Sequence, residues 1–277
     1  MKTEFSSIRR ESPLVLVGGG RMGAAMLSGW LAGGLDPSAV MVVEPFAQAQ
    51  ESLREAYPGL TVVDGMGDVS TAPSVVILAV KPQIMAEVMP PLVAWPDALF
   101  VSIAAGKTLA FFQEHLGADR SIVRVMPNTP AAVGAGISVA VGNDHIKPTD
   151  RALVSALLQA VGMVDWVEDE ALIDAVTAVS GSGPAYVFLL TECMAQAGIE
   201  AGLSPELAGR LARQTVIGSG TLMQHDDADA GTLRKNVTSP GGTTQAALSI
   251  FMDDDRLAIL VAEAIAAAKK RSAELSG

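Results

Sequence analysis

The chain has 277 residues, of which 49% are hydrophobic, and it carries a formal net charge of −11. This length can bury a substantial core in one large or two moderate domains, and two domains are the better interpretation. The acidic balance disfavours nucleic-acid binding, because neutralising phosphates requires clustered Lys and Arg.

The composition also limits the compartment and the chemistry. Cys193 is the single cysteine, which excludes an intrachain disulfide framework and is typical of a reducing, cytoplasmic compartment. The three histidines lie far apart in the chain, so no metal-ligand spacing appears, and the chemistry is expected to be metal-free or to come from a cofactor. Although the mean hydropathy is positive, the apolar runs are short. None approaches the roughly 18 to 20 residues of a membrane-spanning helix, so no membrane partner is expected.

The first half of the chain alternates short β-branched runs with helical stretches. Residues 1–12 lack the apolar core of a signal peptide and are expected to form a ragged N-terminal tail. This alternation predicts a mostly parallel, doubly wound sheet with helices on both faces, in an α/β domain over residues 13–168. Strands are predicted at residues 14–17, 40–43, 60–63, 75–80, 99–103, 122–126, 136–141 and 163–167, and helices at residues 22–33, 47–57, 84–93 and 149–161.

Helical periodicity dominates the second half, with helices predicted at residues 171–201, 205–224 and 244–274. Ser204 and Pro205 form a typical helix start, with serine at the cap and proline at the first helical position. Residues 169–277 are therefore predicted to be an all-α domain. Its many Ala, Gly and Leu residues leave apolar faces that a second copy of the chain could cover, so we expect a homo-oligomer.

The first predicted strand runs into a glycine-rich turn, Gly18-Gly19-Gly20-Arg21-Met22-Gly23, and then into a helix. Gly18 permits the tight turn, Gly20 lets the backbone approach a pyrophosphate, and Gly23 lets the helix pack on the strand. A lone G-x-G-x-x-G could be only a flexible turn. Here the strand before, the helix after and the next strand about 20 residues on are all present. Together they predict a Rossmann domain that binds a dinucleotide.

Glu44 ends the second predicted strand. An acidic side chain at this position would accept hydrogen bonds from an adenosine ribose and repel a 2′-phosphate, which favours NADH. The alternative is a solvated charge at a strand end, followed by Pro45.

Three consecutive predicted strands end in loops of Pro, Gly and small polar residues. Ala79-Val80-Lys81-Pro82 follows the fourth strand, residues 102–108 the fifth and residues 126–130 the sixth. Because open α/β sheets bind ligands at the carboxyl ends of their strands, these loops predict one shared crevice, where a flat ring could lie against small residues. Each loop alone would be an ordinary connection.

Residues 178–186 interrupt a helical pattern with two glycines and a proline. Relative to alanine, this costs a helix about 1 kcal/mol per glycine and about 3 kcal/mol for the proline. A kink at a domain joint would explain the run, and so would close approach to a ligand or a partner helix.

The most specific run is Leu-Arg-Lys-Asn-Val-Thr-Ser-Pro-Gly-Gly-Thr-Thr, residues 233–244. Its glycine pair opens a helix whose first amides, near Thr243 and Thr244, would form an anion site. A plain interhelical loop would need neither the two glycines nor the surrounding hydroxyl groups.

These runs, in this order, resemble pyrroline-5-carboxylate reductases over residues 14–269, with residues 237–244 as the most specific motif. The resemblance implies a Rossmann domain followed by an all-α dimerisation domain, whose interleaved dimers often assemble further, commonly into decamers. It also implies hydride transfer from NADPH or NADH to the imine carbon of 1-pyrroline-5-carboxylate. That reaction gives L-proline, the last step of proline biosynthesis.

The resemblance assigns roles to residues by motif. Thr244 is the catalytic candidate: it would hydrogen-bond the ring nitrogen of the substrate and orient it, with no side chain acting as an obligate acid. The amides at Thr243 and Thr244 would hold the substrate carboxylate, and Asp227 would be a second partner of the ring nitrogen. The substrate-binding set is Val237, Gly242, Thr243, Thr244 and Asp227. The cofactor-binding set is Gly18, Gly20, Arg21, Met22, Gly23, Glu44, Ala79, Val80, Lys81, Pro82, Ala104 and Asn128, of which the last two would lie near the nicotinamide.

Two other functions stay open. A β-hydroxyacid dehydrogenase shares the architecture but relies on a lysine in its helical domain, and this chain has no lysine between Lys147 and Lys235. A non-catalytic dinucleotide sensor would keep the glycine-rich turn but would have no use for a carboxylate loop. The choice between NADH and NADPH also stays open. Family members that favour NADPH commonly have small or basic residues after the second strand and Asn after the third, where this chain has Glu44 and Met66.

Overall fold

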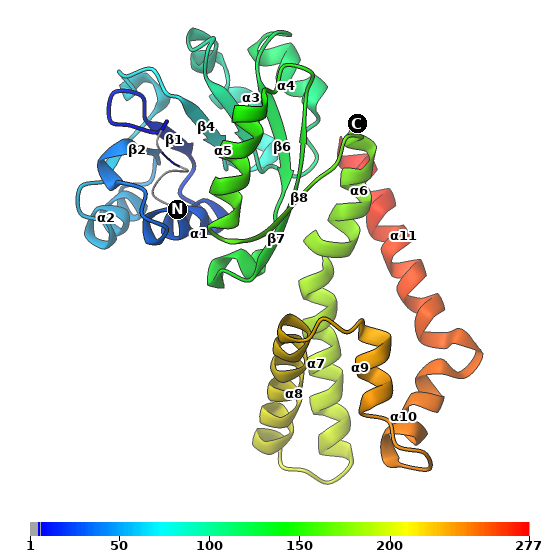
Figure 1. The fold of residues 1–277 in the computed structure, drawn as a ribbon. Helices are drawn as coiled ribbons and strands as arrows, with labels where there is room; N and C mark the ends of the chain where they lie inside the picture. Colours follow the sequence, from blue (N-terminus) through cyan, green and yellow to red (C-terminus); the bar gives the residue numbers. More distant parts are fainter. Residues whose placement is uncertain (1–4, 6, 277) are drawn as a thin grey trace. The chain divides into compact units, whose positions relative to one another are not determined.

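The structure, a computed structural model, describes residue 5 and residues 7–276. The chain forms two compact units (Figure 1). The first runs up to Gly181 and takes in the chain again from Lys269, and the second is Ser182–Ala268. The first unit is an α/β domain, and the second is helical.

One sheet of eight strands forms the centre of the first unit, in the order β3-β2-β1-β4-β5-β6-β7-β8. Neighbouring strands are parallel except for β6 and β7, which are antiparallel. The predicted sheet is therefore confirmed, and each predicted strand is present close to its predicted ends. The strands are β1 (Leu14–Val17), β2 (Val40–Val43), β3 (Thr61–Val63), β4 (Val75–Leu78), β5 (Leu99–Ser102), β6 (Ile122–Met126), β7 (Gly136–Gly142) and β8 (Gly162–Trp166).

The helix predicted at residues 84–93 is wrong as a single helix. Pro90 and Pro91 lack backbone N–H donors, so the short helix ends before them and a 3₁₀ turn follows. Another 3₁₀ turn, which starts at Pro82, precedes the helix. A helix at Leu109–Leu116 was not predicted, and Thr108 caps it by accepting from the N–H of Phe111 at 3.2 Å. The helices of the first unit are α1 (Arg21–Ala32), α2 (Ala47–Ala56), α3 (Met85–Val88), α4 (Leu109–Leu116), α5 (Pro148–Gln159) and α6 (Ile173–Val176). Its 3₁₀ turns are η1 (Pro37–Ala39), η2 (Met66–Asp68), η3 (Pro82–Ile84), η4 (Pro90–Ala94), η5 (Thr129–Val133) and η6 (Glu170–Leu172).

Side chains alternate along the strands between two buried layers. Leu14 and Leu16 of β1 pack in the layer covered by α1, α2 and α5, whereas Val15 and Val17 pack in the layer covered by α3 and α4. Such alternation on a sheet covered on both faces explains why the strands are apolar throughout.

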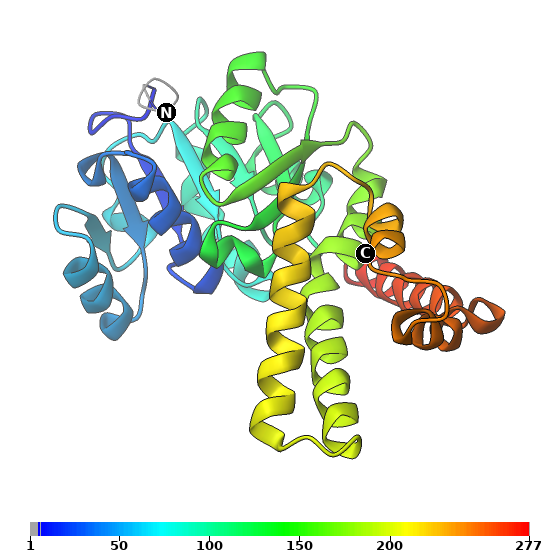
Figure 2. The same cartoon turned by 60° about the horizontal axis from the view of Figure 1, so that its bottom comes forward.

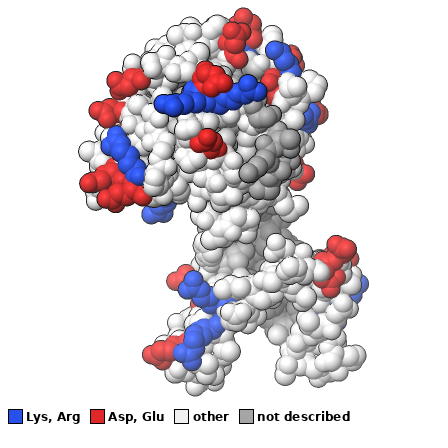
Figure 3. Space-filling view, turned by 60° about the vertical axis from the view of Figure 1, so that its left-hand side comes forward, with Lys and Arg blue, Asp and Glu red and all other residues white. Residues whose placement is uncertain are grey.

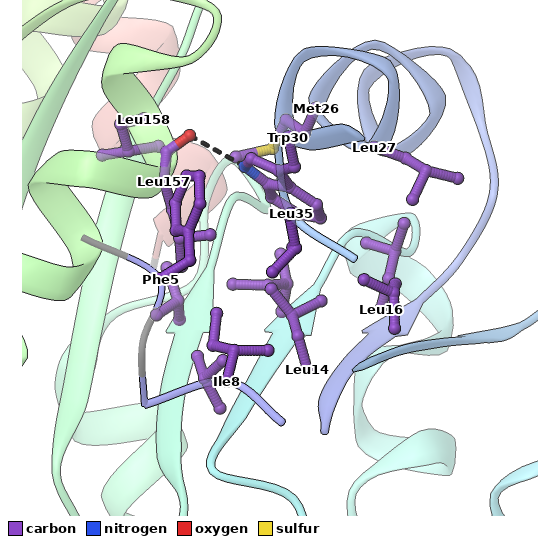
Figure 4. Close-up of a cluster of buried hydrophobic side chains, with 14 of the residues drawn as sticks. Phe5, Ile8, Leu14, Leu16, Met26, Leu27, Trp30, Leu35, Leu157 and Leu158 are labelled. Atoms are coloured by element: carbon purple, nitrogen blue, oxygen red, sulfur yellow. Dashed lines mark hydrogen bonds between the residues drawn. The ribbon is translucent and has the colours of Figure 1, made fainter. Parts of the chain in front are cut away.

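The part of the N-terminal segment that the structure describes, residue 5 and residues 7–12, differs from the ragged tail that we expected. Phe5 and Ile8 are 6% and 5% exposed and belong to the first buried layer, where they lie with Trp30 and Leu157 (Figure 4). The indole N–H of Trp30 donates to the carbonyl of Leu157 at 2.8 Å and joins α1 to α5. Apolar side chains at these two positions supply burial energy that a polar tail would lack. Residues 1–4 and 6 lie outside the described residues.

The long helix predicted at residues 171–201 is interrupted within the first unit. A π-helical turn, η7 (Thr177–Gly181), follows α6 and contains the first glycine of the unusual Gly/Pro run. A Cβ atom on Gly181 would meet the terminal methyl group of Met126, at the end of β6, and that flexible side chain would have to shift. Gly181 in this wide turn therefore lies against a side chain from the sheet. The first unit extends past the boundary predicted at residue 168 and includes this turn.

The second unit contains only helices and turns. Helices α7 (Gly183–Glu200) and α8 (Pro205–His225) form an antiparallel pair (Figures 1 and 2). Ser204 caps α8 as predicted, by accepting from the N–H of Leu207 at 3.3 Å. The short helix α9 (Ala230–Asn236) was not predicted. The single helix predicted at residues 244–274 is instead α10 (Thr243–Met252), η8 (Asp253–Asp255) and α11 (Arg256–Ser276). The break occurs because Asp254 and Asp255 have positive φ angles of 48° and 53°.

The helical unit leaves most of its large apolar side chains exposed. Only small residues, Ala208 and Ala212, are buried among its described residues. On the face drawn in Figure 3, charged side chains are dense over the α/β unit and sparse over the helical unit. The exposed apolar side chains include Val187, Phe188, Leu189, Leu190, Leu211, Ile217, Leu222, Met223, Ile250, Ile259, Leu260 and Val261.

One helical stretch of the described chain, Glu170–Glu200, is long and apolar enough to cross a membrane when judged by length and composition alone. It passes that test on average hydropathy although charged residues interrupt its sequence, among them Asp174 and Glu192. A helix that packs against another protein surface has the same composition, so this stretch is weak support for a membrane span.

Candidate active site

The glycine-rich turn between β1 and α1 is shaped by close backbone contacts. Gly18 has a φ of +102°, and a Cβ atom on it would lie 2.9 Å from the carbonyl oxygen of Ala79. A Cβ atom on Gly23 would collide with the carbonyl oxygen of Gly18. Side chains at these two positions would therefore push the turn away from the sheet, which explains why the local sequence needs glycine.

The N-terminus of α1 is open to an anion. Gly20 is its cap residue and supplies no side-chain acceptor, and the first turn contains no acidic side chain. Arg21 is exposed and Met22 half-buried at the first two helical positions. The first amides of a helix have no partner within the helix, so this turn fits a pyrophosphate.

Glu44 is buried, which excludes the interpretation of a solvated charge at a strand end. The residue is only 5% exposed to solvent. Its Oε2 accepts from the N–H of Gly19 at 2.9 Å, and its Oε1 accepts from the N–H of Phe46 at 3.1 Å. An ionised carboxylate has about four lone-pair directions, so these two bonds leave capacity for ribose hydroxyl groups.

Gln50 and Arg54 of α2 extend this hydrogen-bond network. The amide of Gln50 donates to the carbonyl of Glu44 at 2.6 Å and to the Asp64 carboxylate at 2.7 Å. Arg54 in turn donates to the Gln50 side chain at 3.1 Å and to the carbonyl of Val62 at 3.0 Å. The guanidinium of Arg54 therefore donates to neutral oxygens of Gln50 and Val62. The carboxylate at the end of β2 is that of Glu44.

The predicted crevice loops follow adjacent strands. Strands β1, β4, β5 and β6 are neighbours and parallel, so their carboxyl ends lie along one edge of the sheet. The N–H of Ala79 donates to the carbonyl of Val17 at 2.9 Å, and the N–H of Ile103 donates to the carbonyl of Leu78 at 3.1 Å. Strand pairing therefore continues into the loops. Val80 and Pro82 are half-buried, Lys81 is exposed and Ala104 is buried.

Asn128 follows β6 at the same edge and is 9% exposed. Its Oδ1 accepts from the N–H of Ile137 at 2.9 Å, which ties the loop to β7. No acceptor for the Nδ2 of Asn128 is found in the described part of the chain. One half of this buried amide therefore holds the loop, and the other half can donate to a ligand.

In the second unit, residues 237–242 lead into an uncapped helix, α10. Gly242 is the cap residue and has no capping side chain, and the first turn contains no acidic residue. Gly241 has a φ of +72°, and its N–H donates to the Gln245 side chain at 2.5 Å. The amides of Thr243 and Thr244 have no acceptor among the residues that the structure describes. The predicted anion site is thus geometrically open.

The remaining predicted substrate residues differ in their placement. Val237 caps the end of α9 and is 63% exposed, and Thr244 is half-buried with no hydrogen-bond partner for its hydroxyl in the described chain. Asp227 lies in the exposed link between α8 and α9, and no hydrogen bond or ion pair among the described residues joins it to the loop. The structure brings together Gly242, Thr243 and Thr244 but does not link Asp227 to them.

Asp229 sets the start of α9, the helix before this loop. Its carboxylate accepts from the N–H and the hydroxyl of Thr232, each at 2.9 Å. The hydrogen bond from the Thr232 backbone, followed by that from its side chain, lowers the pKa of Asp229. The residue caps the helix as an ionised carboxylate.

Sequence reasoning missed a buried ion pair close to the crevice. Arg124 of β6 is 4% exposed, and its guanidinium lies 2.8 Å from Oε1 of Glu170. The same Glu170 oxygen accepts from the N–H of Leu109 at 2.8 Å. A charged residue inside the apolar strand Ile122–Met126 was the available signal, because a buried arginine requires a partner.

Comparisons with known proteins identify both units. Residues 170–275 match the family model described as pyrroline-5-carboxylate reductase dimerisation. Residues 13–106 match the model described as NADP oxidoreductase coenzyme F420-dependent. The chain is 40% identical over 265 residues to the pyrroline-5-carboxylate reductase of Pseudomonas aeruginosa, which covers 95% of this chain and 96% of that protein.

Solved structures of pyrroline-5-carboxylate reductases are also similar to this chain. A pyrroline-5-carboxylate reductase from Coxiella burnetii superposes with a TM-score of 0.91 at 34% identity, covering 96% of this chain and 99% of that one. The Plasmodium falciparum pyrroline carboxylate reductase with NADP bound superposes with a TM-score of 0.81 at 28% identity, covering 96% and 98%. The chain described here therefore belongs to the pyrroline-5-carboxylate reductase family.

Proposed function

We propose that this protein reduces 1-pyrroline-5-carboxylate to L-proline with a reduced nicotinamide dinucleotide, the last step of proline biosynthesis. The observation that carries the proposal is identity of 40% to a pyrroline-5-carboxylate reductase over 95% of the chain. The glycine-rich turn and the uncapped helix α10 add the two binding elements that the reaction requires.

The α/β unit holds the dinucleotide in this proposal. The amides around Gly20, Arg21, Met22 and Gly23 bind the pyrophosphate, because the first N–H groups of α1 have no capping side chain. Glu44 accepts from the adenosine ribose. The dinucleotide supplies the hydride, while Asn128 and the chain around Ala104 orient its ring. The crevice is completed by Gly18, Ala79, Val80, Lys81 and Pro82.

The helical unit holds the substrate. The amides of Thr243 and Thr244 bind the carboxylate, and the Thr244 hydroxyl hydrogen-bonds the ring nitrogen and orients the imine carbon. Val237 and Gly242 form the rest of the loop, and Asp227 is the second partner for the nitrogen. A protonated imine is a better electrophile, so a loop that accommodates an iminium needs no obligate acid side chain.

The cofactor is NADH or NADPH, and we propose a preference for NADH. The Glu44 carboxylate is buried at the position where a 2′-phosphate would add a second negative charge. The Plasmodium falciparum relative was solved with NADP, and the matched N-terminal model is an NADP oxidoreductase model, which supports the opposite preference.

We propose a homo-oligomer built on an interleaved dimer. The match to a dimerisation model over residues 170–275 and the exposed apolar side chains of the same region support it. A decamer is the larger assembly to look for by light scattering. The single exposed Cys193 is compatible with a reducing, cytoplasmic compartment. The partner in the reaction is a small molecule, with no nucleic acid or membrane required.

Incubating the protein with reduced dinucleotide and 1-pyrroline-5-carboxylate tests the activity. We expect loss of absorbance at the reduced nicotinamide band together with formation of proline. A β-hydroxyacid dehydrogenase would instead reduce the oxidised cofactor with a hydroxyacid, and a non-catalytic sensor would bind the dinucleotide without consuming it. Either of those outcomes contradicts the proposal.

A further inference from the structure

The last turns of α11 pack on the α/β unit, apart from the rest of that helix. The chain rejoins the first unit at Lys269. Ser272 is 7% exposed, and its hydroxyl donates to Oδ1 of Asp174 in α6 at 2.7 Å. This bond joins residues 98 positions apart and fixes the end of α11 against the start of the helical segment that follows β8.

Three residues beyond Ser272, the chain touches the loop that follows β5. Gly106 of that loop is buried and has a φ of +72°. A Cβ atom on it would lie 2.8 Å from the carbonyl oxygen of Leu275 and 3.3 Å from its Cβ. The backbone of Leu275 in α11 therefore occupies the space that a side chain at residue 106 would fill, and only glycine allows the two segments to lie this close.

The loop has few other means of fixing its position. Its residues Ala104, Ala105 and Gly106 have no polar side chain to anchor it. Within the described chain, the N–H of Ala104 donates to Oγ of Ser102 at 3.2 Å. The next anchor along the chain is Thr108, which caps α4, so between Ala104 and Thr108 the loop is supported by what packs against Gly106.

We infer that the C-terminal turn Ser272–Leu275 is a positioning element for the loop of Ala104 and Gly106, acting through its contact with Gly106 and its anchor on Asp174. The inference rests on the proposed function, because that function places Ala104 beside the nicotinamide ring. Hydride transfer depends steeply on how the ring is placed. The pyrophosphate and ribose are assigned to other strands, at the glycine-rich turn and at Glu44. Loosening the C-terminal turn therefore disturbs the placement of the nicotinamide ring more than it weakens binding of the dinucleotide.

Ser272→Ala tests the anchor. We expect kcat to fall about tenfold, while the Kd of the reduced dinucleotide changes less than about twofold. The emission of the bound reduced nicotinamide, which reports the surroundings of the ring, should lose much of its enhancement. Asp174→Ala should reproduce these effects, and the double variant should add little to either one.

Two matched variants separate positioning from general destabilisation. Asp174→Asn keeps an acceptor for Ser272 and should retain most of the wild-type kcat. Glu274→Ala removes an exposed pair with Arg271, 2.9 Å apart in the same turn, and should leave kcat and emission unchanged.

The outcomes are distinct. If Ser272→Ala lowers the melting temperature but leaves kcat and emission at wild-type values, the turn is only structural and the inference is wrong. If the Kd of the dinucleotide rises as much as kcat falls, the turn serves binding rather than ring placement, which also overturns it. If the wild-type protein does not turn over 1-pyrroline-5-carboxylate, the proposed function fails, but the emission of the bound cofactor still tests the contact.

Discussion

The two binding elements use the same device but are supported differently. Each is a helix N-terminus that follows glycines and has no capping side chain. The turn before α1 lies against Ala79 and is held by the buried Glu44, within a unit that covers its own core. The loop before α10 belongs to a unit whose large apolar side chains are exposed. On the basis of this difference, we propose that one chain completes the dinucleotide site, whereas the substrate site depends on a second copy.

A charge on the exposed apolar surface of the helical unit should break this dependence with the largest effect. Phe188 is 67% exposed on α7. We expect Phe188→Asp to dissociate the oligomer and to lower turnover about a hundredfold or more, because the carboxylate would be buried without a partner in the assembly. Binding of the reduced dinucleotide should change less than about twofold. Light scattering, turnover and cofactor fluorescence measure the three quantities.

The α/β unit offers a matched control for this substitution. Met163 of β8 is 70% exposed, so Met163→Asp adds the same charge to a similarly exposed apolar position. It should leave the oligomer and turnover unchanged. An active, monomeric Phe188→Asp protein would show that the substrate site is complete within one chain.

Thr244→Ala should lower turnover about tenfold, as expected for loss of one hydrogen bond to a charged group. Thr243→Ala is the control, since the adjacent residue contributes only its amide in the proposed site. Steady-state kinetics at saturating dinucleotide measures both variants. Unchanged turnover and substrate affinity in Thr244→Ala would remove the catalytic role of this hydroxyl.

Glu44→Ser should change the cofactor preference toward NADPH about fivefold, because it removes a negative charge near the 2′-position. It also removes the acceptor for the N–H of Gly19, so the KM for NADH should rise. Glu44→Gln, which keeps an acceptor but not the charge, separates these two effects. The ratio of kcat/KM for the two cofactors is the measurement. A strong wild-type preference for NADPH would contradict the argument from charge.

The sequence was informative where local rules and packing agree. Strands such as Leu14–Val17 and Ile122–Met126 were predicted with their observed ends, because apolar runs between turn residues fit a sheet that is covered on both faces. The glycine-rich turn was predicted from its G-x-G-x-x-G spacing between a strand and a helix, and the structure explains two of its glycines by close contacts with Ala79 and within the turn.

The errors have physical causes that lie outside a local window. The break at Asp254 and Asp255 places non-glycine residues at positive φ, which is uncommon even though aspartate adopts it more often than most residues do. The burial of Phe5, the pairing of Arg124 with Glu170, and the contact of Leu275 with Gly106 all join residues distant in the chain. The motifs therefore predicted the candidate binding loops but not the contacts that hold them.

The smallest effect on turnover is expected for substitutions of Asp229. They test whether helix α9 of the same chain also holds the substrate loop. The pKa of Asp229 is lowered in the folded protein by the hydrogen bonds from Thr232. The cap is therefore fully present above about pH 4, the ordinary carboxyl range, and is lost as the pH falls through the lowered pKa. An NMR titration of the Thr232 amide should report this midpoint, and Asp229→Asn should abolish it. Asp227→Asn should leave that titration unchanged, because no bond joins Asp227 to α9 in the described residues. If Asp229→Ala lowered turnover as much as Phe188→Asp, the loop would depend on its own helix α9 rather than on a partner copy, and the contrast between the two units would be wrong.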